Sequence, residues 1–234
     1  MNRTLTILKA ALNHAWAENK VAARDAWQRV KPFRDVDVAR VGYLKKGQII
    51  RLVNACDPGF RPMVQAALLT GCRYGELAAL RVADFNSDKG GTIHIRQSKS
   101  GKTRHVVLTE EGREFFEEVA AGREGADLMF PRPDGDPWAR TQQQRPLKAA
   151  CKRADISPPA SFHTLRHTYA SLLVMADVPL LVVAENLGHA DTRMCEKHYA
   201  HLSETYRAET IRSHAPKLGI VKQGKVVQLG ASRA

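Results

Sequence analysis

Apolar positions along the chain recur mostly at helical spacing. Leu5, Leu8 and Leu12 form a stripe that predicts one amphipathic helix over residues 4–16. Similar stripes, with Gly71 and Gly188 as stop signals, predict the other helices. These lie around residues 49–53, 63–70, 75–80, 109–119, 139–154, 163–175, 180–187, 193–202 and 203–214. The chain is therefore expected to be mainly helical.

Two short segments have a different pattern. Residues 92–96 and 104–108 alternate or carry β-branched side chains, which is typical of strands. They flank the sequence Ser98-Lys-Ser-Gly-Lys102, so we expect a hairpin with Lys99 and Lys102 at its tip. A further strand is predicted at 225–229. The fold class is then α/β and mainly α, with helices around a small antiparallel sheet.

The polar segment 19–40 looks like a connector and contains the only predicted domain boundary. A single helix ahead of a linker cannot bury its own apolar stripe. We therefore expect residues 1–40 to be the end of a domain whose beginning is absent. Residues 41–215 form the main domain, and 216–234 form a polar tail.

Composition narrows the class of protein. The chain has 36 Lys+Arg against 24 Asp+Glu, a net charge of +12, which favours a phosphate polyanion as partner. Nucleic acid is the leading candidate, and the 6% of aromatic residues disfavours a base-stacking single-strand binder. No apolar run approaches the roughly 20 residues of a membrane span, and we expect a cytoplasmic protein. The four scattered cysteines predict reduced thiols rather than disulfides or a zinc site.

His163, Arg166 and His167 lie on one predicted helix. The two histidines have the i, i+4 spacing of zinc ligands, but Thr164 stands where a helical metalloprotease needs Glu. No metal or other cofactor is therefore expected. An isolated pair of His and Arg side chains is most simply interpreted as part of a solvated or capped helix. This interpretation becomes weaker only when the other polar groups of the chain are taken into account.

Those groups lie at turns, at the hairpin tip and on the helix near the end of the chain. With His163 and Arg166 they are Arg73, Lys99, His189, His198 and Tyr199. Such a set suits metal-free phosphoryl transfer at a DNA diester. Two Arg forks can hold the non-bridging oxygens, an imidazole can assist a phenol nucleophile, and a Lys can protonate the leaving oxygen.

Four strings in this order resemble the signature boxes of tyrosine recombinases, in particular phage-type integrases. They are Thr70-Gly-Cys-Arg-Tyr-Gly-Glu-Leu77, His163-Thr-Leu-Arg-His167, Leu187-Gly-His189 and His198-Tyr-Ala-His-Leu202. The match covers roughly residues 43–214. It implies a recombinase catalytic domain that cleaves and rejoins duplex DNA, and it implies that residues 1–40 are the last helix and linker of a truncated core-binding domain.

The resemblance also implies a role for each candidate residue. Arg73 and Arg166 would clamp the phosphate, His163 would be the acid/base, and His189 a hydrogen-bond donor. Lys99 would protonate the 5′-oxygen, and Tyr199 would form a 3′-phosphotyrosyl bond. Glu76 would orient its neighbours. The implied assembly is a homotetramer on two paired DNA sites, and an accessory directionality protein is left open.

Several alternatives remain open. Lys102 rivals Lys99, while Tyr169 and Tyr206 are more simply packing residues. Tyr199 follows His189 by ten positions, one more than the commoner spacing, and Thr164 replaces an acidic residue that could assist the helix start. A type IB-like topoisomerase would use the same chemistry, and a non-catalytic DNA-binding regulator could keep the same scaffold.

Overall fold

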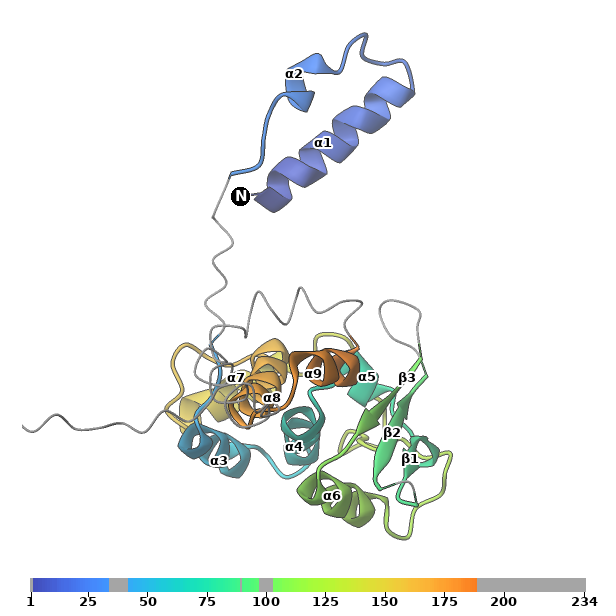
Figure 1. The fold of residues 1–234 in the computed structure, drawn as a ribbon, viewed down its shortest axis with the longest axis vertical. Helices are drawn as coiled ribbons and strands as arrows, with labels where there is room; N and C mark the ends of the chain where they lie inside the picture. The colour runs from blue at the N-terminus through green and yellow to red at the C-terminus, as the bar shows by residue number, and fades with distance from the viewer. Residues whose placement is uncertain (1, 34–41, 89, 97–102, 189–234) are drawn as a thin grey trace, which may run out of the picture. The chain divides into compact units, whose positions relative to one another are not determined.

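The computed structural model describes residues 2–33, 42–88, 90–96 and 103–188 (Figure 1). The chain divides into two compact units, Met1–Arg40 and Val41–Ala234, and each is described by itself. The helices predicted at 193–202 and 203–214, the strand at 225–229 and the tail lie outside the described residues. So does the tip of the predicted hairpin.

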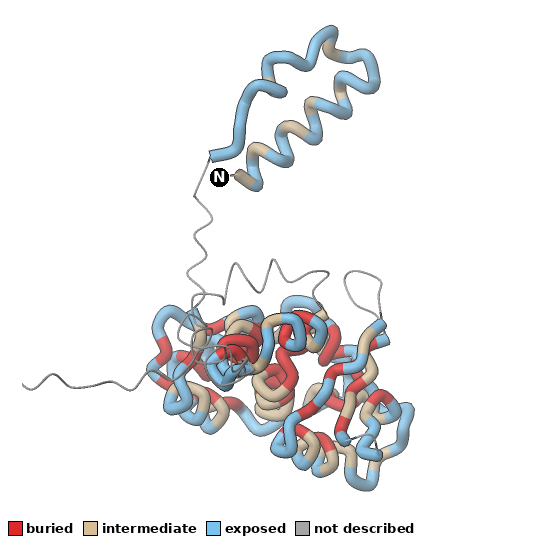
Figure 2. Tube along the Cα trace, in the orientation of Figure 1, coloured by how far each residue is buried: buried red, intermediate tan, exposed pale blue. Residues whose placement is uncertain are grey.

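The first unit contains helix α1 (Asn2–Ala17) and the short helix α2 (Asp25–Gln28). The predicted first helix is confirmed, but α2 interrupts the segment predicted to be a continuous connector. Trp27 Nε1 donates to Asn13 Oδ1 at 2.8 Å, and Lys9 Nζ donates to the Val30 carbonyl, so the returning segment lies along α1. None of the 16 residues of α1 is buried (Figure 2).

The helices of the second unit follow the predicted stripes closely. They are α3 (Lys46–Ala55), α4 (Arg61–Thr70), α5 (Tyr74–Ala78), α6 (Glu110–Ala120), α7 (Gln144–Arg153), α8 (Phe162–Met175) and α9 (Leu180–Leu187), with the 3₁₀ turn η1 (Val82–Asp84). Helix α7 begins five residues later than the predicted start at residue 139. The Gln142 side chain accepts from Ala139 N at 2.7 Å, and this local bond holds a turn instead of a helix.

Three antiparallel strands form a sheet in the order β1-β2-β3. They are β1 (Phe85–Asn86), β2 (Thr92–Ile95) and β3 (Arg104–Val107). The predicted hairpin pairing is confirmed, with Ile93 opposite Val106 and both fully buried. Strand β1 was not predicted, because two residues are too few to show a period. On the other face of the sheet, His94 and His105 stack with ring centroids 4.8 Å apart.

The main core lies around α4, which packs against α8, α3, α5 and α6. A second cluster joins α8 to α9 through Tyr169, Val183 and Leu187. Helix α9 in turn contacts β3, so α4, α5, α8, α9 and β3 converge on one region of the unit (Figure 1). No helix in the described part of the chain is long and apolar enough to cross a bilayer.

Candidate active site

Arg73 is placed by a sharp turn between α4 and α5. Gly71 ends α4 in the left-handed conformation with φ of 63°. A Cβ atom there would lie 2.4 Å from the Tyr169 ring and 2.7 Å from Leu187, so only glycine fits this close approach. Arg73 then serves as the N-cap residue of α5 and extends from the turn.

The Glu76 carboxylate holds Arg73 in place. It accepts from the Arg73 backbone N at 2.8 Å and from Arg73 Nη1 at 2.8 Å. Arg104, at the start of β3, donates to the same carboxylate from Nη1 at 3.0 Å and Nη2 at 2.8 Å. This bidentate bond ties the hairpin strand to the turn that carries Arg73. The structure therefore agrees with the expected orienting role of Glu76.

At this site the attraction between opposite charges outweighs the cost of burying them. Burial raises the pKa of Glu76, but the hydrogen bonds and charge of Arg104, together with the Arg73 bonds, hold it at about 2. Burial lowers the pKa of Arg104, and the Glu76 bonds reverse this so that the pKa is raised. Glu76 and Arg104 are therefore both charged at neutral pH.

Arg166 is buried at 4% exposure, and carbonyl groups at the ends of two helices hold it. Its Nη1 donates to the Gly71 carbonyl and its Nη2 to the Leu187 carbonyl, both at 2.7 Å. Helix C-termini carry partial negative charge and favour a cation there. Burial, followed by the nearby charge of Arg73, lowers the pKa of Arg166 to about 10, which keeps the guanidinium charged at neutral pH.

His163 lies in the first turn of α8, and its side chain is exposed. Ser161 caps this helix by accepting from Thr164 N at 3.1 Å, and the Thr164 hydroxyl accepts from Ser161 N at 3.1 Å. Helix α8 has no acidic residue in its first turn, and the Thr164 hydroxyl closes a capping box there instead. The cap fixes the first turn, which presents His163 beside Arg166.

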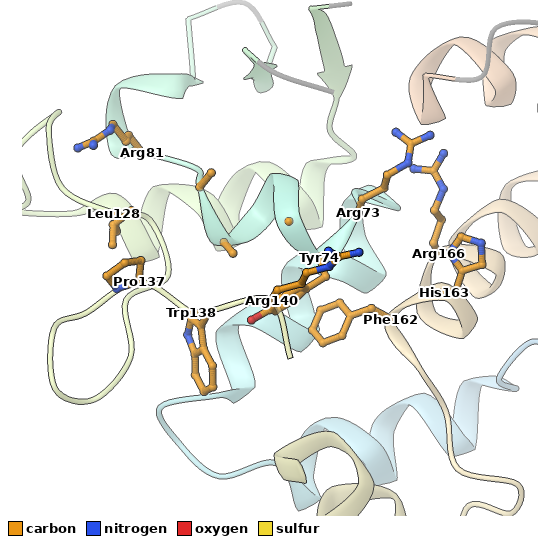
Figure 3. A pocket seen from close by; sticks show the side chains of 13 residues that line it. Arg73, Tyr74, Arg81, Leu128, Pro137, Trp138, Arg140, Phe162, His163 and Arg166 are labelled. Atoms are coloured by element: carbon orange, nitrogen blue, oxygen red, sulfur yellow. The ribbon is translucent and has the colours of Figure 1, made fainter. Parts of the chain in front are cut away.

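Arg73, His163 and Arg166 line one cavity of about 990 Å³ (Figure 3). Figure 3 shows the guanidinium groups of the two arginines lying side by side, with the His163 ring near the backbone end of the Arg166 side chain. They come from α5 and α8, which are far apart in the sequence. Two fixed cations and an imidazole at a cavity can bind a tetrahedral oxyanion and handle a proton beside it.

The other candidate residues lie outside the described part of the chain. They are Lys99, its rival Lys102, His189, His198, Tyr199 and the rival phenol Tyr206. Tyr169 is described and belongs to the core. Its ring is 6% exposed and its hydroxyl accepts from Asn186 Nδ2 at 2.7 Å.

Two residues of this region were missed by sequence reasoning. Arg104 holds Glu76, and its Nε donates to the Asn186 carbonyl at 3.2 Å. The Asn186 side chain bonds both the N–H and the carbonyl of Val107, at 2.7 and 3.2 Å. The sequence did contain a signal for Arg104, because this residue lies on the same buried face of its strand as Val106. A charge in that position requires a partner.

Helix α8 carries the two histidines whose spacing is that of zinc ligands, so their geometry bears on a metal site. His163 and His167 have ring centroids 5.1 Å apart, at an interplanar angle of 82°. Within the described ranges, no three His, Cys, Asp or Glu side chains group closely enough to hold a metal ion. The three described cysteines, Cys56, Cys72 and Cys151, are buried free thiols.

Comparison with known proteins gives consistent matches. The sequence profile of the phage integrase family matches residues 42–205. Tyrosine recombinase XerD of Ralstonia nicotianae is 27% identical, over 92% of this chain and 73% of that protein. The integrase of Salmonella phage P22 is 28% identical, over 89% of this chain, which spans 55% of the phage protein.

Solved structures give the same result for the fold. The catalytic domain of bacteriophage HP1 integrase aligns with a TM-score of 0.58 and 27% identity, over 78% of this chain and 99% of that domain. The Tn1549 transposon integrase, solved in complex with circular intermediate DNA, aligns with a TM-score of 0.71 and 21% identity, over 91% of this chain and 78% of that one. The predicted fold class is confirmed. Since the family profile covers most of the chain, this protein belongs to the phage integrase family of tyrosine recombinases.

Proposed function

We propose that this protein is a site-specific DNA recombinase that cleaves and rejoins duplex DNA through a covalent 3′-phosphotyrosyl intermediate. The observation that carries the proposal is the pairing of Arg73 and Arg166 beside His163 at one cavity. Family membership supports it, and XerD and the P22 integrase bear recombinase and integrase names. The chain spans 73% of the length of this XerD and 55% of the P22 integrase, so the activity requires a direct test on this chain.

In the proposed reaction, the Tyr199 oxygen attacks the phosphorus and the bond from phosphorus to the 5′-oxygen breaks. His163 accepts the phenol proton, and Lys99 gives a proton to the leaving 5′-oxygen. Arg73, Arg166 and His189 bind the non-bridging oxygens, where negative charge grows in the transition state. The phosphotyrosyl bond replaces one diester with another, so the reverse attack by a 5′-hydroxyl reseals the strand without a nucleotide cofactor.

The partner in this proposal is duplex DNA, bound by a homotetramer on two paired sites. The net charge of +12 supports a polyanionic partner. The Tn1549 integrase was solved with DNA, and that relative has the same fold. Residues 1–40 would then be the last part of a core-binding domain, and the absence of any buried residue in α1 is consistent with a surface that packs elsewhere.

The test uses a nicked duplex with randomised flanks. After cleavage near the nick, a short fragment diffuses away and the covalent intermediate is trapped. We expect a denaturation-resistant adduct with the unchanged chain and with Tyr206→Phe, and none with Tyr199→Phe. Tyr206→Phe is the matched control, because it removes a phenol close by in the sequence. An adduct that persists in Tyr199→Phe would contradict the proposed nucleophile.

Topoisomerase activity is the second candidate, since the described residues serve it equally well. Sequencing the trapped DNA identifies the preferred site. A recombinase exchanges strands between two duplexes that carry this site, whereas a topoisomerase relaxes supercoiled plasmid that lacks it. We expect strand exchange only between duplexes that both carry the preferred site. Relaxation without the site, and no exchange, would favour the topoisomerase.

A further inference from the structure

The cavity at the two arginines continues past them toward the loop of residues 131–143. There its walls are aromatic, formed by Tyr74, Trp138 and Phe162 (Figure 3). These rings are held by others, because Phe162 packs on Tyr74 with centroids 5.0 Å apart and Phe60 packs on Trp138 at 5.1 Å. Phe162 belongs to the core, and the partly buried Tyr74 and Trp138 pack against it, so ring contacts hold all three walls.

The lining of the same cavity is also cationic. Arg81 and Arg140 line it together with Arg73 and Arg166, and the described residues that line it include neither Asp nor Glu. The Tyr74 hydroxyl donates to the Ala139 carbonyl at 2.7 Å, which fixes the chain immediately before Arg140. The cavity thus combines aromatic walls with arginine side chains and no acidic residue among its described lining.

This combination fits a nucleotide better than a phosphate alone. Cations suffice for a phosphate, and its volume is far below the 990 Å³ of the cavity. Flat aromatic walls match the face of a nucleobase, which stacks on such rings with little dependence on its identity. A base inside a duplex cannot reach a protein wall, so the base must leave the stack to occupy this space.

We propose that the aromatic end of the cavity holds an unstacked nucleotide next to the reacting phosphate, with its base against Trp138 and Tyr74 and a neighbouring phosphate at Arg140. This inference rests on the proposed function, because it requires the reacting phosphate to lie between Arg73 and Arg166. It goes beyond that function by assigning a base-binding role to residues outside the candidate catalytic set.

The first test isolates the fluorescence of Trp138. The chain has three tryptophans, and Trp16 and Trp27 belong to the first unit, so the full-length double variant Trp16→Phe/Trp27→Phe leaves Trp138 as the single emitter. It is titrated with a single-stranded hexanucleotide, and with the same backbone carrying tetrahydrofuran in place of every base. Both strands have the same charge, so they differ only in their bases.

We expect the base-containing strand to quench Trp138 and to bind about tenfold more tightly than the abasic strand. Equal quenching and equal affinity for the two strands would overturn the proposal and leave a site for phosphates only. The absence of quenching by either strand would also overturn it. Neither result depends on cleavage, so a chain that forms the Tyr199 adduct without base-dependent quenching keeps the proposed function and loses this inference.

A second measurement uses single variants and labelled strands. In Trp138→Leu, the tenfold preference for the base-containing strand should disappear, whereas the exposed Trp16→Leu should keep it. Arg140→Gln should lower the salt dependence of binding by about one counterion. Its matched control is Arg132→Gln on the same loop, since Arg132 pairs with Asp134 at 2.5 Å and should leave the salt dependence unchanged. An unaltered preference in Trp138→Leu would contradict the assigned wall.

Discussion

At the scale of single residues, the site depends on how one carboxylate distributes its bonds. Glu76 is 8% exposed, and it accepts hydrogen bonds from the side chains of Arg73 and Arg104. Arg104 does not line the cavity, but it holds the Glu76 carboxylate, which in turn holds Arg73 at the cavity. Loss of either arginine would leave the buried carboxylate with a single charged partner, which is costly even though an intact buried pair adds little net stability.

Glu76→Gln tests this dependence through pH. The pKa of Glu76 is about 2 in the folded chain against an ordinary value of 4.5, so its carboxylate stabilises the fold above pH 4.5. This contribution, about 3 kcal/mol, is lost as pH falls from about 4.5 through 2. We expect Glu76→Gln to be less stable than the unchanged chain by about 3 kcal/mol at pH 7 in urea unfolding.

The gap between the two proteins should then narrow as pH is lowered, because the unchanged chain gains a proton at Glu76 and the variant has none to gain. Comparing the two proteins at each pH cancels the titration of the other acids. A gap of the same size at pH 7 and pH 3 would contradict the assigned cause.

At the scale of elements, the site is built where helices begin and end. The last carbonyls of α4 and α9 hold Arg166, the first turn of α8 carries His163, and the start of α5 carries Arg73. Helix ends leave backbone groups unpaired, and here one guanidinium satisfies two of them. Changes at these ends should therefore affect the site more than changes in the middle of the same helices.

Gly188 at the end of α9 offers one such test. It has a φ of 69°, and a Cβ atom there would lie 2.7 Å from Arg104 Cδ. Gly122 has the same φ of 69° with nothing within 4 Å, so it is a matched control for backbone strain alone. We expect Gly122→Ala to cost about 1 kcal/mol in urea unfolding, and Gly188→Ala to cost clearly more. Equal losses would show that the approach to Arg104 is relieved at no cost.

The N-caps of α8 and α6 provide a second pair. Ser161 accepts from Thr164 N at 3.1 Å, and Thr109 accepts from Gly112 N at 3.1 Å. Ser161→Ala and Thr109→Ala should each lose about 1 kcal/mol of stability. Only Ser161→Ala should also slow adduct formation, because α8 carries His163 and Arg166 and α6 carries no candidate residue. Equal slowing in both variants would indicate a general loss of folding.

At the scale of the whole molecule, the surplus of positive charge should govern DNA binding. The net charge is +12, and counterion release makes phosphate contacts sensitive to salt. We expect non-specific duplex binding to weaken about 100-fold between 50 and 200 mM salt, as about four phosphate contacts would give. Fluorescence anisotropy with a labelled duplex measures this, and tight binding that ignores salt would contradict it.

The sequence allowed most of the described helices and the hairpin to be predicted, because their apolar residues recur at 3.6 or 2 positions. Helix α2 and strand β1 were missed, since four and two residues carry no usable period. Arg73, His163 and Arg166 were identified from motifs and lie together. The roles of Arg104 and Asn186 were not predicted, because their partners in α5, α8 and β3 are brought near only by tertiary packing.

The most direct test of the central claim is to identify the atoms that join protein and DNA. The adduct trapped on the nicked duplex is digested with protease and nuclease and analysed by mass spectrometry. We predict that the modified peptide contains Tyr199, linked through its phenolic oxygen to the 3′-phosphate of the cleaved strand. Attachment at Tyr206 or to a 5′-phosphate would contradict the account.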